Sequence, residues 1–173
     1  MKKTILKIII LLWMILIFIL SNQPAEESTE LSDGFISKTI GSIYKITHKN
    51  TTEEKLIEIK EKYTHIVRKT AHFTIYLILG LLIGKLLKEY NITNKQLILY
   101  GILICMLYAI SDEIHQIFVS GRSGEIKDVL IDTCGSTVGI TIINIKRLIN
   151  KNWLFYLNDY KNTKYYDIIY IEK

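Results

Sequence analysis

Ionisable and polar side chains gather at the ends of the apolar segments of this chain. Charged groups at membrane depth are energetically costly, so they usually mark function. Histidines can exchange protons near neutral pH, carboxylates can tune them or hold a cation, and arginines can clamp a phosphate or carboxylate bidentately. The set therefore predicts a binding site for an anionic lipid head group or a peptide carboxylate. Its members are Arg68, His72, Tyr76, Ser111, Asp112, Glu113, His115, Gln116, Arg122, Asp128 and Asp132.

The spacing of these residues indicates which of them share a helix face. Arg68, His72 and Tyr76 recur at every fourth position, so they form one line along a helix. Asp128 and Asp132 are also four apart and open a helix, where negative charge meets the positive end of the helix dipole. If the chain starts in the cytoplasm, both lines lie at the outer face of the membrane.

The remaining candidates lie around the end of the third apolar segment. Asp112, His115 and Gln116 are expected to share a helix face there. Glu113 is expected to point elsewhere, and Arg122 lies in a tight, glycine-flanked turn. In the alternative interpretation, the same charges pair with one another and hold the helix ends together, which also explains ionisable residues at this depth.

Other site chemistries have weak support in the sequence. The pair Glu113 and His115 is a fragment of a zinc motif, but no two histidines at i and i+4 flank a glutamate, so no metal or other cofactor is expected. Ser111 lacks the strand-turn-helix elbow of a serine nucleophile. Cys105 and Cys134 fall inside apolar segments, where a thiol behaves as a small buried hydrophobe.

The composition indicates a small integral membrane protein. The 173 residues are 49% hydrophobic and include a single proline, and the mean hydropathy is +0.23. We therefore predict an all-α membrane bundle with about four transmembrane helices. The net charge of +5 comes from lysines beside the apolar segments, which favours contact with membrane lipid and not with nucleic acid.

Four apolar stretches are long enough to span a bilayer. They run from Ile5 to Leu20, from Thr70 to Leu87, from Leu97 to about Val119 and from Val129 to Ile145. They divide the chain into an N-terminal anchor, an extracytoplasmic loop with amphipathic helices, a three-helix core and a polar, aromatic cytoplasmic tail. These parts cover residues 1–21, 22–69, 70–145 and 146–173.

The lysines at the segment ends predict a multi-pass protein of the cell membrane with both termini in the cytoplasm. The first loop is the exception, because it carries eight Lys or Arg residues. No A-x-A pattern follows the first segment, so we expect an uncleaved anchor.

Parts of the loop and the tail have weaker patterns. Thr51 and Glu54 form a capping box, and the helical spacing from Leu56 to Phe73 predicts that the second membrane helix begins outside the bilayer. A stripe from Leu31 to Ile43 could lie along the membrane surface or pack on the bundle. The tail after Ile145 is rich in aromatic residues, which indicates interfacial anchoring.

Two small-xxx-small patterns indicate close helix contact. Gly80 and Gly84 carry one in the second span, and Gly135 and Gly139 carry the other in the fourth. The two helices are expected to touch each other, or one of them to dimerise. The oligomeric state is left open.

The motifs together resemble the VanZ-like family over about Trp13 to Ile145. The resemblance implies a small multi-spanning membrane protein whose namesake is an accessory protein of glycopeptide resistance that lowers susceptibility to teicoplanin. Ile75 departs from the family pattern, which often has Glu there, and Asp132 replaces an expected Asn and must be protonated or paired. The matching stretches are Ser21-Asn-Gln-Pro24, Arg68-Lys-Thr-Ala-His72-Phe-Thr-Ile-Tyr76-Leu-Ile-Leu-Gly80, Ser111-Asp-Glu-Ile-His-Gln-Ile-Phe118-Val-Ser-Gly-Arg122, Asp128, Gly135 and Gly139.

Three functional hypotheses follow. The first is an outward-facing polar pocket that binds an envelope-associated ligand, such as a lipid-linked cell-wall precursor or a lipoglycopeptide, with teicoplanin resistance as one consequence. The second is a membrane hydrolase or transferase acting on a phospholipid or lipid-linked precursor, in which a histidine is nucleophile or base and Arg68 and Arg122 hold the phosphate. The third is a structural partner of another membrane protein. The residues do not decide whether any chemistry is catalysed.

Overall fold

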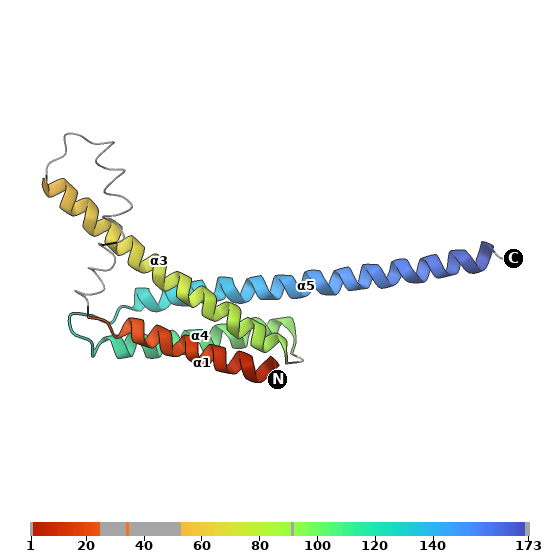
Figure 1. Ribbon diagram of the computed structural model, residues 1–173, viewed down its shortest axis with the longest axis horizontal. Helices are drawn as coiled ribbons and strands as arrows, with labels where there is room; N and C mark the ends of the chain where they lie inside the picture. Colours follow the sequence, from red (N-terminus) through yellow and green to blue (C-terminus); the bar gives the residue numbers. More distant parts are fainter. Residues whose placement is uncertain (1, 25–33, 35–52, 91, 172–173) are drawn as a thin grey trace.

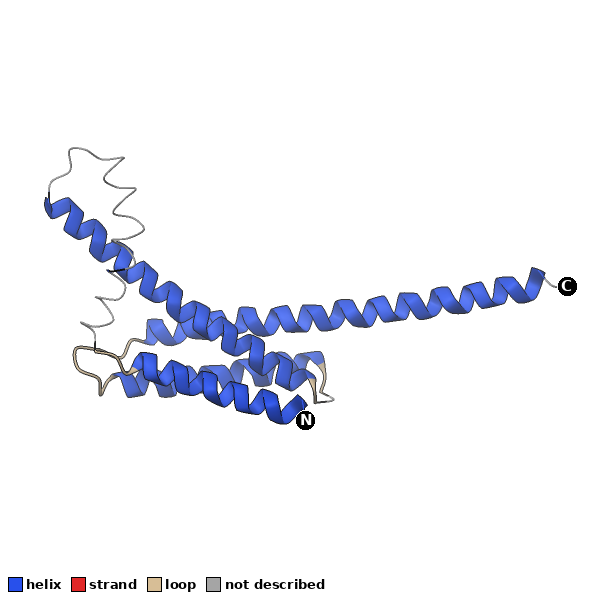
Figure 2. Ribbon diagram, viewed as in Figure 1, coloured by secondary structure: helices blue, strands red, loops and turns tan. Residues whose placement is uncertain are grey.

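The apolar segments of the chain form long helices, because backbone polar groups in a bilayer must be satisfied within the helix. The computed structural model describes residues 2–24, 34, 53–90 and 92–171 (Figure 1). These residues form helices and turns without strands (Figure 2), which confirms the predicted all-α class. The helices are α1 (Lys2–Ser21), α3 (Glu53–Lys88), α4 (Asn94–Gln116) and α5 (Ile126–Ile171).

Each of these helices contains a stretch long and apolar enough to cross a membrane, as predicted. The stretches are Lys2–Ser21, Lys62–Lys88, Asn94–Gln116 and Ile126–Asn150.

The ends of α4 show where local signals start and stop a helix. Thr93 caps the start: its Oγ1 accepts the Gln96 N–H at 3.2 Å, and Gln96 Oε1 accepts the Thr93 N–H at 2.9 Å. The helix ends at Gln116, not near Val119 as predicted. The amides of Phe118 and Val119 donate to carbonyls three residues back, both at 3.0 Å, and Gly121 then turns the chain with a φ of 73°.

The four helices lie side by side as a bundle with two distinct ends (Figure 1). The N-terminus and the α3–α4 connection lie at one end, and the end of α1 and the α4–α5 connection lie at the other. The line of candidates on α3 therefore meets the candidates near the end of α4 and at the start of α5. We call this the site end of the bundle.

Glycines bring the backbones of α3 and α5 into direct contact. A Cβ built on Gly80 would meet backbone atoms of Ser136, and one on Gly135 or Gly139 would meet backbone atoms of α3. A Cβ on Gly84 would meet only a side chain of α5, at 3.1 Å. The two small-xxx-small patterns therefore face each other within one chain.

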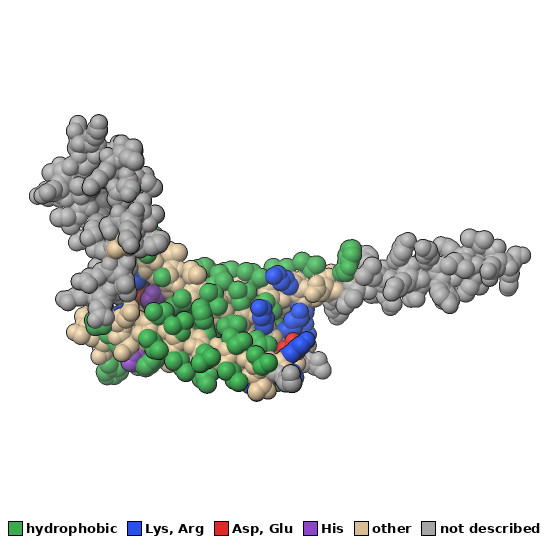
Figure 3. All heavy atoms as spheres, viewed as in Figure 1, with side chains coloured by type: hydrophobic (Ala, Val, Ile, Leu, Met, Phe, Trp, Pro, Cys, Tyr) green, Lys and Arg blue, Asp and Glu red, His purple; other side chains and the backbone are tan. Residues whose placement is uncertain are grey.

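Helix α1 is attached to α3 and to α4 by one side-chain-to-backbone hydrogen bond each. The indole Nε1 of Trp13 donates to the Ile75 carbonyl at 3.0 Å, and the Tyr108 hydroxyl donates to the Met14 carbonyl at 2.6 Å. Apolar side chains cover the flank of the bundle, as expected for a surface that faces lipid, and Lys and Arg gather at the end opposite the site end (Figure 3).

Helices α3 and α5 both extend beyond their apolar stretches. The capping box rests on Thr51, and that residue and the stripe from Leu31 to Ile43 lie outside the described residues. Helix α3 is continuous from Glu53, in agreement with a second helix that starts before its apolar stretch. Helix α5 continues to Ile171, where the sequence had indicated only a polar, aromatic tail.

Candidate functional site

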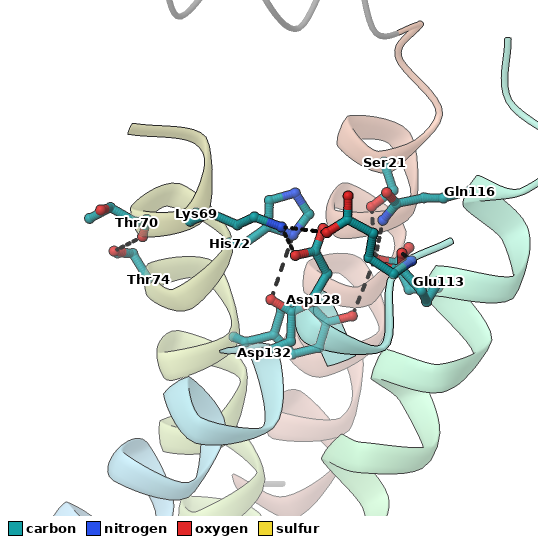
Figure 4. Close-up of polar contacts among 12 residues, drawn as sticks. Ser21, Lys69, Thr70, His72, Thr74, Glu113, Gln116, Asp128 and Asp132 are labelled. Carbon is teal, nitrogen blue, oxygen red and sulfur yellow. Dashed lines mark hydrogen bonds and ion pairs between the residues drawn. The ribbon is translucent and has the colours of Figure 1, made fainter. Parts of the chain in front are cut away.

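Three helices and one loop bring charged side chains together inside the site end (Figure 4). Most of the predicted candidates lie here, although they come from three separate stretches of the sequence. Those that contact the site interior are Arg68, His72 and Tyr76 of α3, Asp112, Glu113 and Gln116 of α4, Arg122 of the α4–α5 loop, and Asp128 and Asp132 of α5.

A small pocket opens among these side chains. Its volume of about 60 Å³ leaves room for a few water molecules or one small anion. The residues that line it are Arg68, His72, Gln116, Gly121, Arg122, Ser123, Glu125 and Asp128.

The two arginines of the pocket lack carboxylate partners. Within the described part of the chain, neither Arg68 nor Arg122 forms an ion pair; Arg122 Nη1 donates to Gln116 Oε1 at 2.9 Å. Burial and then the charge of Arg68 lower the pKa of Arg122 from its ordinary value, and Asp112 and Glu113 oppose the lowering. A guanidinium stays charged under such conditions, so the pocket holds positive charge that an anion can compensate.

Asp112 is the centre of a buried hydrogen-bond cluster behind the pocket. It is 2% exposed, and its Oδ2 accepts from Ser21 Oγ at 2.8 Å and from the Tyr76 hydroxyl at 3.3 Å. Gln116 Nε2 donates to the same oxygen at 3.3 Å. The Gln116 amide therefore connects Asp112 to Arg122 and orients the guanidinium.

His72 and Asp132 form a second buried pair. His72 Nδ1 lies 3.5 Å from Asp132 Oδ1, and Asp132 is 1% exposed. The distance is long for a hydrogen bond, but such contacts are often long without a bound ligand. Asp132, which replaces an expected Asn and was predicted to be protonated or paired, therefore lies opposite the His72 ring.

Lys69 forms ion pairs with two carboxylates at the start of α5. Its Nζ forms an ion pair with Asp128 and lies 3.6 Å from Glu125 Oε2. Glu113 accepts the Glu125 backbone N–H at 2.6 Å, which fixes the loop before α5. These contacts hold helix ends together, as the alternative interpretation of the charges had it. They leave the arginines of the pocket free.

The structure corrects the predicted orientations of Glu113 and His115 on α4, whereas Asp112 and Gln116 share a face as predicted. Glu113 is 6% exposed and turns to the α4–α5 loop, whereas His115 turns to α1. The His115 ring stacks on Phe18 with centroids 4.1 Å apart, and its Nε2 lies 3.2 Å from Asn22 Oδ1. Ser111 is exposed and donates to a carbonyl of its own helix at 2.7 Å. Because α1 covers one side of α4 and α5 the other, His115 and Ser111 lie outside the pocket.

Sequence reasoning missed three members of the site: Ser21, Lys69 and Glu125. Ser21 belongs to one of the quoted motifs, but nothing local reveals that it reaches Asp112. Glu125 directly precedes a helix, a position where acidic residues are favoured, and this was an available signal. Among the described residues, no group of three His, Cys, Asp or Glu side chains is arranged to hold a metal ion.

Four helices able to span a membrane, with charges gathered inside one end, define a multi-pass helical membrane protein. The family model described as VanZ/LLP1 matches residues 6–147. The chain therefore belongs to the VanZ/LLP1 family, which confirms the resemblance of its motifs. No curated protein and no solved structure matches the chain.

Proposed function

We propose that the pocket binds the phosphate or carboxylate group of an envelope-associated lipid or lipid-linked molecule. The observation that supports this is the pair of guanidiniums, Arg68 and Arg122, which share a pocket and form no ion pair with a carboxylate of the described residues. Guanidinium groups bind phosphate and carboxylate through paired, charge-assisted hydrogen bonds. The Gln116 amide holds Arg122 in place before the ligand arrives.

The size of the pocket limits what enters it. About 60 Å³ accepts a terminal anionic group but not a whole lipoglycopeptide or disaccharide. We infer that only the charged end of the ligand is inserted while the remainder lies in the membrane or outside it.

The distribution of basic residues supports an extracytoplasmic position for the pocket. Exposed lysines gather at the end of the bundle opposite the site, and such residues favour the cytoplasmic face. They are Lys2, Lys3, Lys7, Lys85, Lys88, Lys95 and Lys146. An outward-facing anion site that holds a cell-wall precursor or an anionic lipid would change what a lipoglycopeptide meets at the membrane, and lowered teicoplanin susceptibility is the consequence we propose.

The third hypothesis, a structural partner that docks through its glycine faces, has less support. The glycine faces of α3 and α5 are buried against each other within one chain. They offer no free surface to another helix.

Anion binding can be tested with Arg68→Gln, because Arg68 makes no hydrogen bond or ion pair within the described residues and the change removes little besides charge. Inorganic phosphate and dihexanoyl phosphatidate are titrated into the purified protein by calorimetry. Loss of a charged hydrogen bond of about 1.5–3 kcal/mol predicts at least a tenfold weaker affinity. Lys146→Gln, an exposed cation at the opposite end, is the matched control and should bind as the wild type does.

Two results would contradict the proposal. The first is the absence of saturable binding of either anion to the wild type. The second is equal affinity in the Arg68 and Lys146 variants. In a host where the protein lowers teicoplanin susceptibility, Arg68→Gln should abolish this effect at unchanged membrane abundance.

A further inference from the structure

His72 lies between a buried carboxylate and the pocket. Its Nδ1 faces Asp132 at 3.5 Å, and its other ring nitrogen points away from Asp132 (Figure 4). That nitrogen, Nε2, makes no hydrogen bond within the described part of the chain. A carboxylate at Nδ1 favours the tautomer with its proton there, which leaves Nε2 as a base.

The same pocket can hold a phosphate beside this base. Arg68, Arg122 and Gln116 line it together with His72. Two guanidiniums are suited to stabilise the charge that develops on a phosphoryl group during its transfer. The volume of about 60 Å³ suits a terminal phosphate and not a phosphorus atom with bulky groups on two sides, so a monoester fits best.

An open groove of about 390 Å³ lies beside the pocket on the outer surface of α3 and α5. Lys69 lines the groove, and its ion-pair partner Asp128 lines the pocket, so Lys69 stands at the boundary between the two. Ile66, Phe73 and Ile131 give the groove an apolar wall within the membrane-spanning stretches. A molecule with its phosphate in the pocket can therefore extend an alkyl chain along the groove. The full lining is His65, Ile66, Lys69, Thr70, Phe73 and Ile131.

We propose that the protein hydrolyses lipid phosphate monoesters at this pocket, an activity that rests on the anion binding proposed above. The oxygen of a water molecule forms a bond to phosphorus while the bond from phosphorus to the lipid oxygen breaks. His72 Nε2 takes a proton from the water, and Lys69 gives a proton to the departing lipid oxygen. The products are inorganic phosphate and a lipid alcohol. The proton on His72 returns to Lys69 through solvent.

Release of inorganic phosphate from dioleoyl phosphatidate by the purified full chain in nanodiscs tests the activity. His72→Gln should lower kcat by about 10²- to 10⁴-fold, the usual contribution of a general base, without weakening phosphate binding. Asp132→Asn keeps an acceptor for Nδ1–H but removes its charge, so it should lower kcat less and leave KM unchanged. His115→Gln is the matched control, because His115 faces α1, and should retain full activity.

The substrate class is tested by comparing phosphatidate with a soluble monoester and by placing a larger side chain in the groove. Ile131→Trp should raise KM for phosphatidate and leave turnover of glycerol 3-phosphate unchanged. Glycerol 3-phosphate hydrolysed as efficiently as phosphatidate by the wild type would overturn the assignment to lipids.

The failures of this inference and of anion binding are distinguishable. Saturable phosphate binding without turnover of either ester would overturn the hydrolase and leave the anion site intact. Equal activity of His72→Gln and wild type would overturn the role of His72. Absence of phosphate binding would overturn both proposals.

Discussion

Replacing Gly80 by alanine tests whether backbone contact between α3 and α5 holds the site together. A Cβ at Gly80 would lie inside van der Waals contact with the carbonyl group and the Cα of Ser136. These atoms belong to a helix backbone and cannot turn aside as a side chain can. The two helices must therefore move apart to accept a single methyl group.

The expected magnitude is the balance of two terms. Alanine is favoured over glycine inside a helix by about 1 kcal/mol. Overpacking costs about 1–3 kcal/mol, and an unyielding backbone places Gly80→Ala near the upper value. The free energy of unfolding should thus fall by about 2 kcal/mol.

Gly84→Ala is the matched control, one turn further along the same helix. It has the same gain in helix propensity, but its Cβ would meet the side chain of Ile143 at 3.1 Å, where a small adjustment suffices. Its stability should change little.

Unfolding by a graded addition of SDS, followed by circular dichroism, gives both free energies. The Gly80 variant should also bind phosphate more weakly, because Arg68 of α3 and Arg122 of the loop before α5 line one pocket, and separation of the two helices moves the arginines apart. Variants equal in stability within about 0.5 kcal/mol, the usual error of such comparisons, would refute the reasoning.

Three further changes test other parts of the molecule. Lys69→Met leaves Asp128 buried without its cation and should lower the free energy of unfolding by about 3–5 kcal/mol. Adding Asp128→Asn should recover most of that loss. A Lys69→Met variant as stable as the wild type would contradict the pairing. Arg147→Gln removes a 2.7 Å bond to a carbonyl of the α3–α4 connection and should cost about 1–3 kcal/mol of stability with phosphate affinity intact. Single cysteines at Arg68 and Arg122, in a background without native cysteines, should react with an impermeant maleimide from the same, extracytoplasmic side. Labelling from opposite compartments would exclude a shared pocket.

The buried charges of the site end divide into two groups with different consequences. Lys69 and Asp128 neutralise each other, so their pairing contributes to the docking of α5 on α3 and adds no net charge to the pocket. Arg68 and Arg122 have no such partner among the described residues, which is why the anionic group of a ligand is expected at the arginines. An unpaired charge in a half-buried position destabilises the protein without ligand, and the binding of an anion offsets that cost.

Hydrogen bonds connect helix α1 to the pocket. Ser21, the last residue of α1, donates to Asp112, which accepts from Gln116, which in turn accepts from Arg122. A change at Ser21 is therefore connected to the pocket by three hydrogen bonds. Ser21→Ala removes the first donor of this series of hydrogen bonds and leaves the residues that line the pocket unchanged.

Much of the fold follows from the sequence alone. Long apolar runs interrupted by lysines become spanning helices because no other backbone arrangement satisfies its hydrogen bonds in lipid. Periodicity of 3.6 residues aligns Arg68, His72 and Tyr76 without reference to any neighbour. The glycine patterns indicate that two helices approach closely.

Only the tertiary structure decided how each helix is rotated about its axis and which side chains face one another. The opposite orientations of Glu113 and His115 depend on the α4–α5 loop and α1 lying on different sides of α4, and α1 is far from those residues in the sequence. The pairings of His72 with Asp132 and Lys69 with Asp128 likewise depend on the register that the glycine contact sets between α3 and α5. Helix formation is governed by local hydrogen bonds and burial in lipid, whereas register is governed by contacts between residues far apart in the chain, and a single sequence does not contain that information in local form.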